Sequence, residues 1–231
     1  MDYDNSSSSP SYSYRPSGYQ PFYSQHLVSL CRLTFVKESL IVLVERALSL
    51  ISDLNTWFAD STSSLDPVDI QNFSCVLECQ LLSWLQSNEG LILPLEDALC
   101  VALLIFAVCT TAALASQSYP FHPLASKRLR KALSATSRNE WQAAPDLLLW
   151  ILAVGAISAE GSQDYEWFIY QTSLACDEFG IGSAAAFLRR LHDCGWVGLR
   201  LDKAVEWLWG KIEKIRLEGH CFIPIKSFAY T

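Results

Sequence analysis

Apolar residues recur at steps of three and four along most of this chain, beginning at about residue 26. A period near 3.6 residues places such side chains on one face of an α-helix. The first segment with this spacing predicts one long amphipathic helix over residues 27–57. Its apolar positions are Leu33, Val36, Leu40, Leu43, Ala47, Leu50 and Leu54.

Later segments repeat the period and add signals for where helices begin and end. Asp66 before Pro67 predicts a capped start, and Asn88-Glu89-Gly90 predicts the end of that helix. Another helix is expected from near Pro94 to about Ser116. Further helices are expected over 127–135, 145–161, 163–179 with a stop at Gly180, 183–194 with Ser183 as its cap, and from a cap at Asp202 to about Ile215.

These elements predict an all-α fold, an irregular domain of about eight helices over residues 26–219. Residues 1–25 are rich in Ser, Tyr and Pro and lack the aliphatic side chains that form a core, so we expect a disordered leader. Residues 220–231 form a short C-terminal extension that carries the one weak strand-like pattern.

Two uncharged stretches raise the question of a membrane. Residues 98–115 contain eighteen uncharged residues, which reaches the lower limit for a membrane span. The stretch LLLWILAVGAISAEG (147–161) has thirteen residues between Asp146 and Glu160, about 20 Å of helix against a hydrocarbon core of about 30 Å. Helices that are apolar all round also fill the centre of helical proteins, and burial is the favoured interpretation. A membrane-associated protein that uses 98–115 as its span is the alternative.

The net charge and the spacing of the cysteines argue against two kinds of function, nucleic-acid binding and metal binding. The net charge of −7 argues against direct nucleic-acid binding, which depends on Lys and Arg. No C-x2-C pair occurs, and Cys75 and Cys79 form a lone i,i+4 pair, so we expect neither a zinc site nor another cofactor. The other cysteines fall mostly in apolar patterns, as expected for reduced thiols of an intracellular protein.

Sequence motifs for catalysis are weak. His192, Asp193 and Cys194 are adjacent, but neighbours on a helix point to different sides. The acidic residues around Gly161 and the basic run KRLRK (127–131) are typical of helix ends and exposed faces. We therefore predict no enzyme. We expect the eight tryptophans to fill core volume. The alternative is that several of them line a pocket for a small apolar effector.

The order of these segments resembles the regulatory domain of fungal zinc-cluster transcription factors. That family shows an LLW-x-L-x-x-G-A/G-I-A stretch followed by a Trp-Phe pair, and a Leu-Trp pair near its end. The similarity covers about residues 66–215. The matching positions, expected to be structural, are Leu148, Leu149, Trp150, Gly155, Ala156, Trp167, Phe168, Leu208 and Trp209.

The chain departs from the family pattern at the DNA-binding zinc cluster, whose C-x2-C-x6-C start does not occur in these residues. The resemblance therefore implies a regulator of transcription without its own DNA-binding module. Such a domain acts in the nucleus, or in the cytoplasm, by binding a protein partner or a small apolar effector between helices. It implies no catalytic or metal-binding residue.

Overall fold

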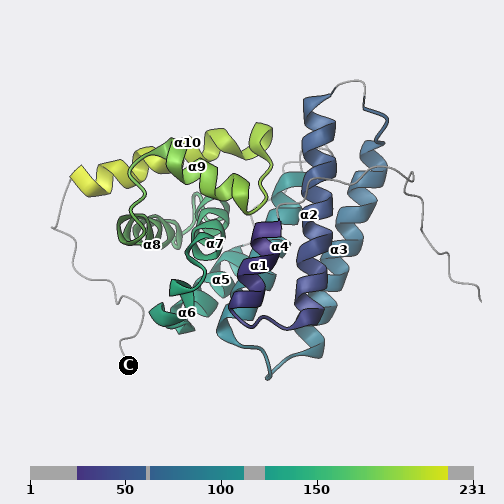
Figure 1. Cartoon of the computed structure of the whole chain (residues 1–231), viewed down its shortest axis with the longest axis horizontal. Helices are drawn as coiled ribbons and strands as arrows, with labels where there is room; N and C mark the ends of the chain where they lie inside the picture. Colours follow the sequence, from purple (N-terminus) through teal and green to yellow (C-terminus); the bar gives the residue numbers. More distant parts are fainter. Residues whose placement is uncertain (1–24, 61–62, 112–122, 218–231) are drawn as a thin grey trace, which may run out of the picture.

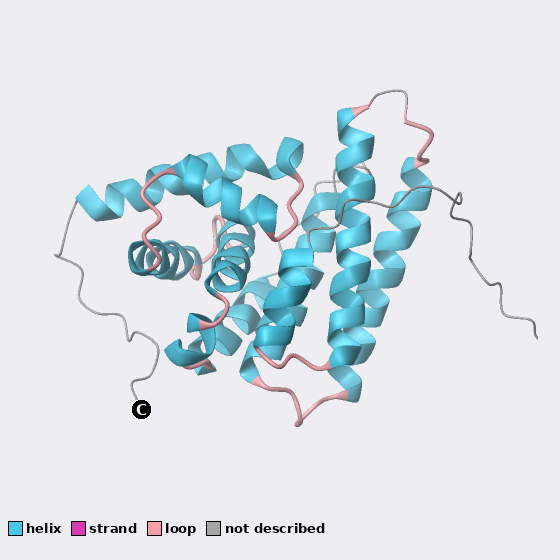
Figure 2. Cartoon of the chain, in the orientation of Figure 1, coloured by secondary structure: helices cyan, strands magenta, loops and turns pink. Residues whose placement is uncertain are grey.

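The computed structural model describes residues 25–60, 63–111 and 123–217, and over this part of the chain the fold is all-α, as predicted (Figure 2). The predicted leader and C-terminal extension lie almost entirely outside the described residues. The helices are α1 (Gln25–Leu33), α2 (Glu38–Ala59), α3 (Pro67–Ser87), α4 (Pro94–Thr111), α5 (Pro123–Ala135), α6 (Arg138–Gln142), α7 (Pro145–Ser158), α8 (Tyr165–Glu178), α9 (Ala184–Asp193) and α10 (Gly198–Leu217).

Two groups of helices share one core (Figure 1). The long helices α2 and α3 run side by side at one edge of the molecule, and α4 packs against both of them. Helices α8, α9 and α10 lie at the other edge. Helix α7 joins the two groups, because it contacts α4 on one side and α8, α9 and α10 on the others.

Helix α7 is buried on every side. Each residue from Asp146 to Ala156 is buried, including the central Trp150. The sequence stretch that raised the membrane question is therefore a core helix, as the favoured interpretation predicted. Helix α4 is long and apolar enough to cross a membrane by length and composition, but 72% of its candidate span is buried inside the domain.

The N-terminal helical segment is two helices, so the prediction of a single helix over 27–57 is wrong. The amide of Val36 donates to the carbonyl of Cys31 (3.0 Å) and that of Phe35 to Arg32 (3.1 Å). These two bonds form a Schellman motif, whose central residue adopts a left-handed conformation. Here that residue is Phe35, with φ of +56°. The sequence hid the break because this position carries no glycine.

Other boundaries follow the local signals closely. The Asp66 carboxylate accepts from the amide of Val68 (2.8 Å), and the Ser183 hydroxyl accepts from that of Ala186 (3.2 Å), so both predicted caps are confirmed. The predicted cap at Asp202 is wrong, because α10 already begins at Gly198. The short helix α6 was not predicted.

Helices α7 and α8 approach closely at Gly155. A Cβ atom built at this position would overlap ring carbons of Phe168, lying 2.6 Å from Cδ1. The missing side chain therefore lets the Phe168 ring pack against the α7 backbone. This contact explains why a small residue, Gly155, stands in the middle of the apolar stretch.

We expect Gly155→Ala to destabilise the protein by about 1–3 kcal/mol, because the added methyl group overpacks a core contact. The matched control is Gly210→Ala in α10, where no atom lies within 4 Å of the added Cβ. Alanine's higher helix propensity should make that variant about 0.5–1 kcal/mol more stable. Urea unfolding measures both. Equal shifts of the two variants in the same direction would contradict the close approach.

Candidate functional site

The residues that carry the family resemblance lie in the interior of α7, α8 and α10. Their side chains form contacts with one another and with the core: Trp167 meets Phe168 edge to face at 5.0 Å, and Trp209 packs 6.0 Å from Phe187. At these positions the side chains belong to the core. The buried motif positions are Leu148, Leu149, Trp150, Gly155, Ala156, Trp167, Phe168, Leu208 and Trp209.

Trp150 holds the turn between α9 and α10 in the core. Its indole nitrogen donates to the carbonyl of Gly195 at 2.9 Å, and both groups are buried. Gly195 has φ of +94°, and a Cβ there would lie 2.5 Å from Leu48 of α2. Trp196, on the same turn, packs against Phe106 of α4 with ring centroids 5.5 Å apart and ring planes tilted by 50°. The turn therefore ties α10 to both halves of the fold.

The residues considered for catalysis do not assemble into a reactive group. His192 pairs with Asp202 (3.1 Å) at the surface. Cys194 is fully buried. Burial, followed by the nearby carboxylates of Asp146 and Asp193, raises the pKa of its thiol far above the ordinary value. A thiol held in its protonated form is a poor nucleophile.

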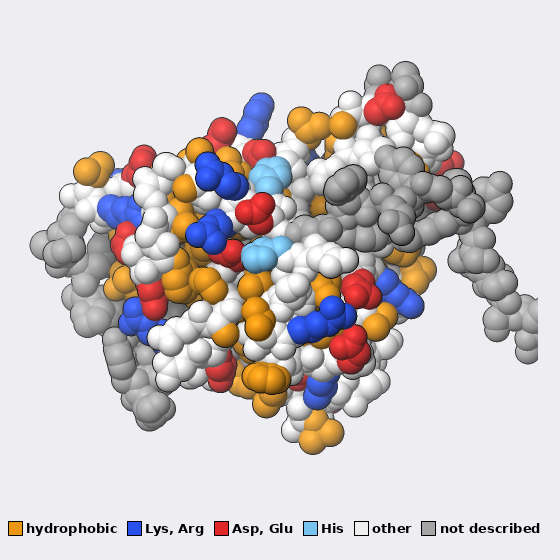
Figure 3. Space-filling view, viewed as in Figure 1, with side chains coloured by type: hydrophobic (Ala, Val, Ile, Leu, Met, Phe, Trp, Pro, Cys, Tyr) orange, Lys and Arg blue, Asp and Glu red, His pale blue; other side chains and the backbone are white. Residues whose placement is uncertain are grey.

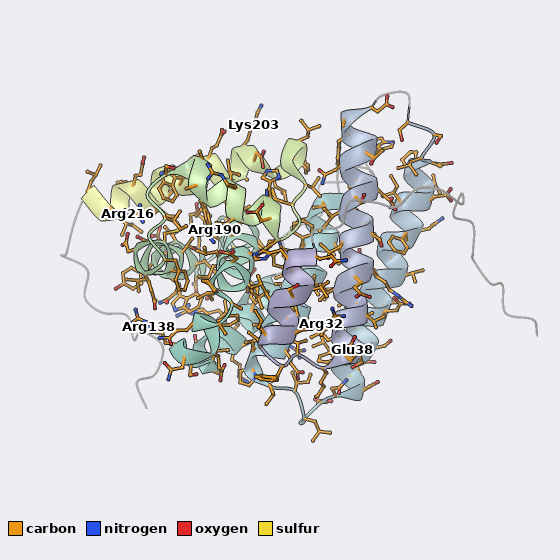
Figure 4. The ribbon with its side chains drawn as sticks, viewed as in Figure 1. Arg32, Glu38, Arg138, Arg190, Lys203 and Arg216 are labelled. Carbon is orange, nitrogen blue, oxygen red and sulfur yellow. The ribbon has the colours of Figure 1, made fainter. Side chains whose placement is uncertain are left out.

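A buried carboxylate connects α1 to α9. Asp146, at the start of α7, accepts from Nε2 of His26 (2.9 Å) and lies 3.0 Å from the guanidinium of Arg190. Acidic, basic and histidine side chains gather on the corresponding face in Figure 3, and Arg190 is labelled in Figure 4. Because Asp146 pairs with both His26 and Arg190, these contacts hold α1, α7 and α9 together.

A different region presents apolar side chains to solvent. We call it the loop end: the α1–α2 turn, residues 33–37, and the α3–α4 loop, residues 88–93, which lie together at the lower edge of Figure 1. Phe35 is 89% exposed and Leu91 is 75% exposed. Leu33 and Leu93 are exposed as well. The loop end therefore offers a group of large apolar side chains on two adjacent loops.

Glu96 fixes the two loops of the loop end to each other. Its side chain is buried and accepts from the amide of Lys37 (2.9 Å) and from the amide of Leu93 (3.3 Å). The Lys37 ammonium lies 3.4 Å from the same carboxylate and donates to the carbonyl of Leu91 (3.1 Å). A carboxylate with several charge-assisted bonds holds its partners in one geometry. The exposed side chains thus stand on a rigid base.

A basic groove adjoins the loop end. It encloses about 830 Å³ between the α3–α4 loop and α5. Arg128 and Arg130 pair with Asp97 and Asp164, at 2.8 and 2.6 Å. Lys127 and Lys131 also line the groove, and no carboxylate of the described chain lies within ion-pair distance of either. We call this the α5 groove. Glu89 lines it as well, so its four basic side chains exceed its three carboxylates by one, on a chain whose net charge is −7.

Sequence reasoning missed the loop end. In the sequence, Leu33 fits a continuous helical face, and Phe35 and Leu91 carry no motif. A Schellman motif without glycine leaves no composition signal, and the Lys37–Glu96 contact joins residues 59 positions apart. For the basic run of the α5 groove, the sequence predicts only an exposed helix face.

Comparison with known proteins identifies no relative of this chain. No protein-family model matches the chain, and neither a curated protein nor a solved structure matches it significantly.

We expect Trp150→Phe to cost about 2–4 kcal/mol of unfolding free energy, because it leaves the buried Gly195 carbonyl without this donor and removes core volume. Trp207→Phe is the control, since Trp207 is half-exposed and stacks on Tyr165 at 5.8 Å. That change should cost less than about 1 kcal/mol. Chemical denaturation followed by circular dichroism measures both, and equal costs would argue against the buried hydrogen bond.

We expect Glu96→Gln to loosen the loop end and to destabilise the protein by about 2 kcal/mol, because charge-assisted bonds to two loops are weakened. Hydrogen exchange should accelerate at the amides of Lys37 and Leu93. The control is Glu38→Gln: Glu38 is exposed and lies 3.7 Å from Arg32 (Figure 4), so its loss should change stability by less than about 0.5 kcal/mol. Unchanged exchange at both amides in Glu96→Gln would refute the clamp.

Proposed function

We propose that this chain is a non-catalytic regulatory domain that acts on transcription by binding a protein partner at the loop end. The part in transcription, and action in the nucleus, rest on the resemblance of residues 66–215 to the regulatory domain of zinc-cluster transcription factors. The partner-binding surface rests on the structure of the loop end. The two components are tested separately below.

The observation that carries the proposal is the conformation and exposure of Phe35. A left-handed backbone costs a residue with a side chain about 1–2 kcal/mol relative to the right-handed form, and a glycine avoids this cost. The same Schellman motif ends α8, where Ile181 donates to Cys176 (2.8 Å), and there the left-handed residue is Gly180. At the α1–α2 turn the chain instead holds a phenylalanine in this conformation and leaves its ring in water. Strain and exposure together favour a role in binding.

The shape of the surface favours a protein over a small molecule. Small apolar ligands bind in concave sites that cover most of their surface. Phe35 and Leu91 instead project from loops, as anchors do when they fill pockets on a partner. We therefore place the partner's pocket over these side chains.

The two exposed lysines of the neighbouring α5 groove indicate the chemistry of the partner. Lys127 and Lys131 are exposed there beside Leu124, which is 80% exposed. Charge complementarity favours an acidic segment that also carries apolar side chains. The partner we expect has a pocket for the loop end and an acidic flank for the α5 groove.

Phe35→Gly separates binding from stability. We expect it to keep or raise the free energy of unfolding by about 1 kcal/mol, because glycine relieves the left-handed strain. Binding should fall at least tenfold, because an anchoring side chain is lost. Affinity capture from cell extract, quantified by mass spectrometry, would compare the wild type, Phe35→Gly and Leu199→Ser, an exposed leucine on α10.

The proposal requires a protein that binds the wild type and Leu199→Ser equally but not Phe35→Gly. Equal recovery of every bound protein by all three chains would overturn it. Vesicles of phosphatidylcholine and phosphatidylserine test whether the loop end binds a lipid surface instead of a protein. Binding to vesicles that Phe35→Gly abolishes would replace the protein partner with a lipid surface.

Transcription is tested by fusing the chain to an unrelated DNA-binding domain and measuring a reporter gene. We expect the wild-type fusion to change reporter output and the Phe35→Gly fusion to lose that effect. A wild-type fusion without effect, in cells where the partner is captured, would reject the regulatory role and keep the binding surface.

A further inference from the structure

Cys75 and Cys79 differ from the other cysteines that the structure describes, because both are exposed. The remaining described thiols are buried or half-buried, and burial raises their pKa values, to about 12 for Cys100 and about 11 for Cys109. A protonated, enclosed thiol neither reacts nor binds metal readily. The enclosed thiols are Cys31, Cys100, Cys109, Cys176 and Cys194.

The exposed pair has a separation suited to one bridging atom. Residues four apart on a helix share a face, with Cβ atoms about 5–6 Å apart. A disulfide needs Cβ atoms about 3.5–4.5 Å apart, so Cys75 and Cys79 cannot close one without unwinding α3. Two sulfurs on this face can instead approach a single ion from opposite sides.

The pair also lines a groove on the outer surface of the domain. The groove has a volume of about 550 Å³ between α2 and α3, and its wall includes Leu43, Val76 and Trp84. The thiols are thus accessible from solvent and border a largely apolar wall. Residue Trp84 places an optical reporter in the same groove.

We propose that Cys75 and Cys79 together bind one Cu(I) ion as a two-coordinate dithiolate site. Soft thiolate ligands select Cu(I), which accepts two ligands. A structural zinc site takes four, and no group of three or more His, Cys, Asp or Glu side chains in the described chain could hold an ion. Binding converts two thiols and Cu(I) into S–Cu–S, with release of two protons and no change of oxidation state.

The test uses the full chain, reduced and free of oxygen, titrated with Cu(I) against a chromogenic Cu(I) chelator. We expect one Cu(I) per chain in the wild type and loss of binding by at least tenfold in Cys75→Ser and in Cys79→Ser. Binding should be retained in Cys221→Ser, which removes the cysteine that lies outside the described residues. Bound Cu(I) should also change Trp84 fluorescence, measured as the difference from Trp84→Phe.

The spacing is tested by moving one thiol without changing their number. In Cys79→Ser/Gln80→Cys the sulfurs stand about 140° apart around the helix axis, so binding should fall as in the single variants. Circular dichroism confirms that each variant is folded. A wild type that binds no Cu(I), or a double variant or Cys75→Ser that binds as tightly as the wild type, would overturn the proposal.

Discussion

The fold depends on one constraint: α7 is buried on all sides, so each neighbouring element must fit it. Phe168 can lie against its backbone only because Gly155 has no side chain. The Trp150 indole, which has no access to water, requires an acceptor, and the turn at Gly195 supplies it. That turn orients α10, and the contact with α4 connects α7 to the other half of the molecule. A central helix without a solvent face thus sets the positions of elements far from it in the sequence.

The parts of the structure that sequence reasoning predicted are those with local causes. Helical periodicity, the cap at Asp66 and the stop at Gly180 depend on residues within one or two turns, and the structure confirms them. The α1–α2 break was missed because Phe35 occupies a position where glycine is usual. The cap at Asp202 failed because the turn before α10 is held by tertiary contacts, which override a local preference. The loop end could be recognised only in the structure, because it forms where two loops distant in the sequence come together.

The loop end and the core are linked through the start of α4. Glu96 lies in the first turn of this buried helix. Its buried carboxylate accepts hydrogen bonds from both loops. Mobile apolar side chains lose conformational entropy when they are immobilised in an interface. Because Glu96 already holds the two loops in place, the free domain has less conformational entropy to lose when a partner binds. Phe35 keeps its left-handed conformation because the packed helices α1 and α2 on either side of the turn determine it.

The contact between His26 and Asp146 has a consequence for synthesis of the chain. The two residues are separated by 120 positions, so α1 leaves the ribosome long before the carboxylate that fixes it. At a translation rate of about 5–20 residues per second, the delay is roughly 6–24 s. During that interval the apolar face of α1, which includes Leu27 and Cys31, lacks its final neighbours on α7. The nascent chain therefore has a defined interval in which chaperones can recognise α1.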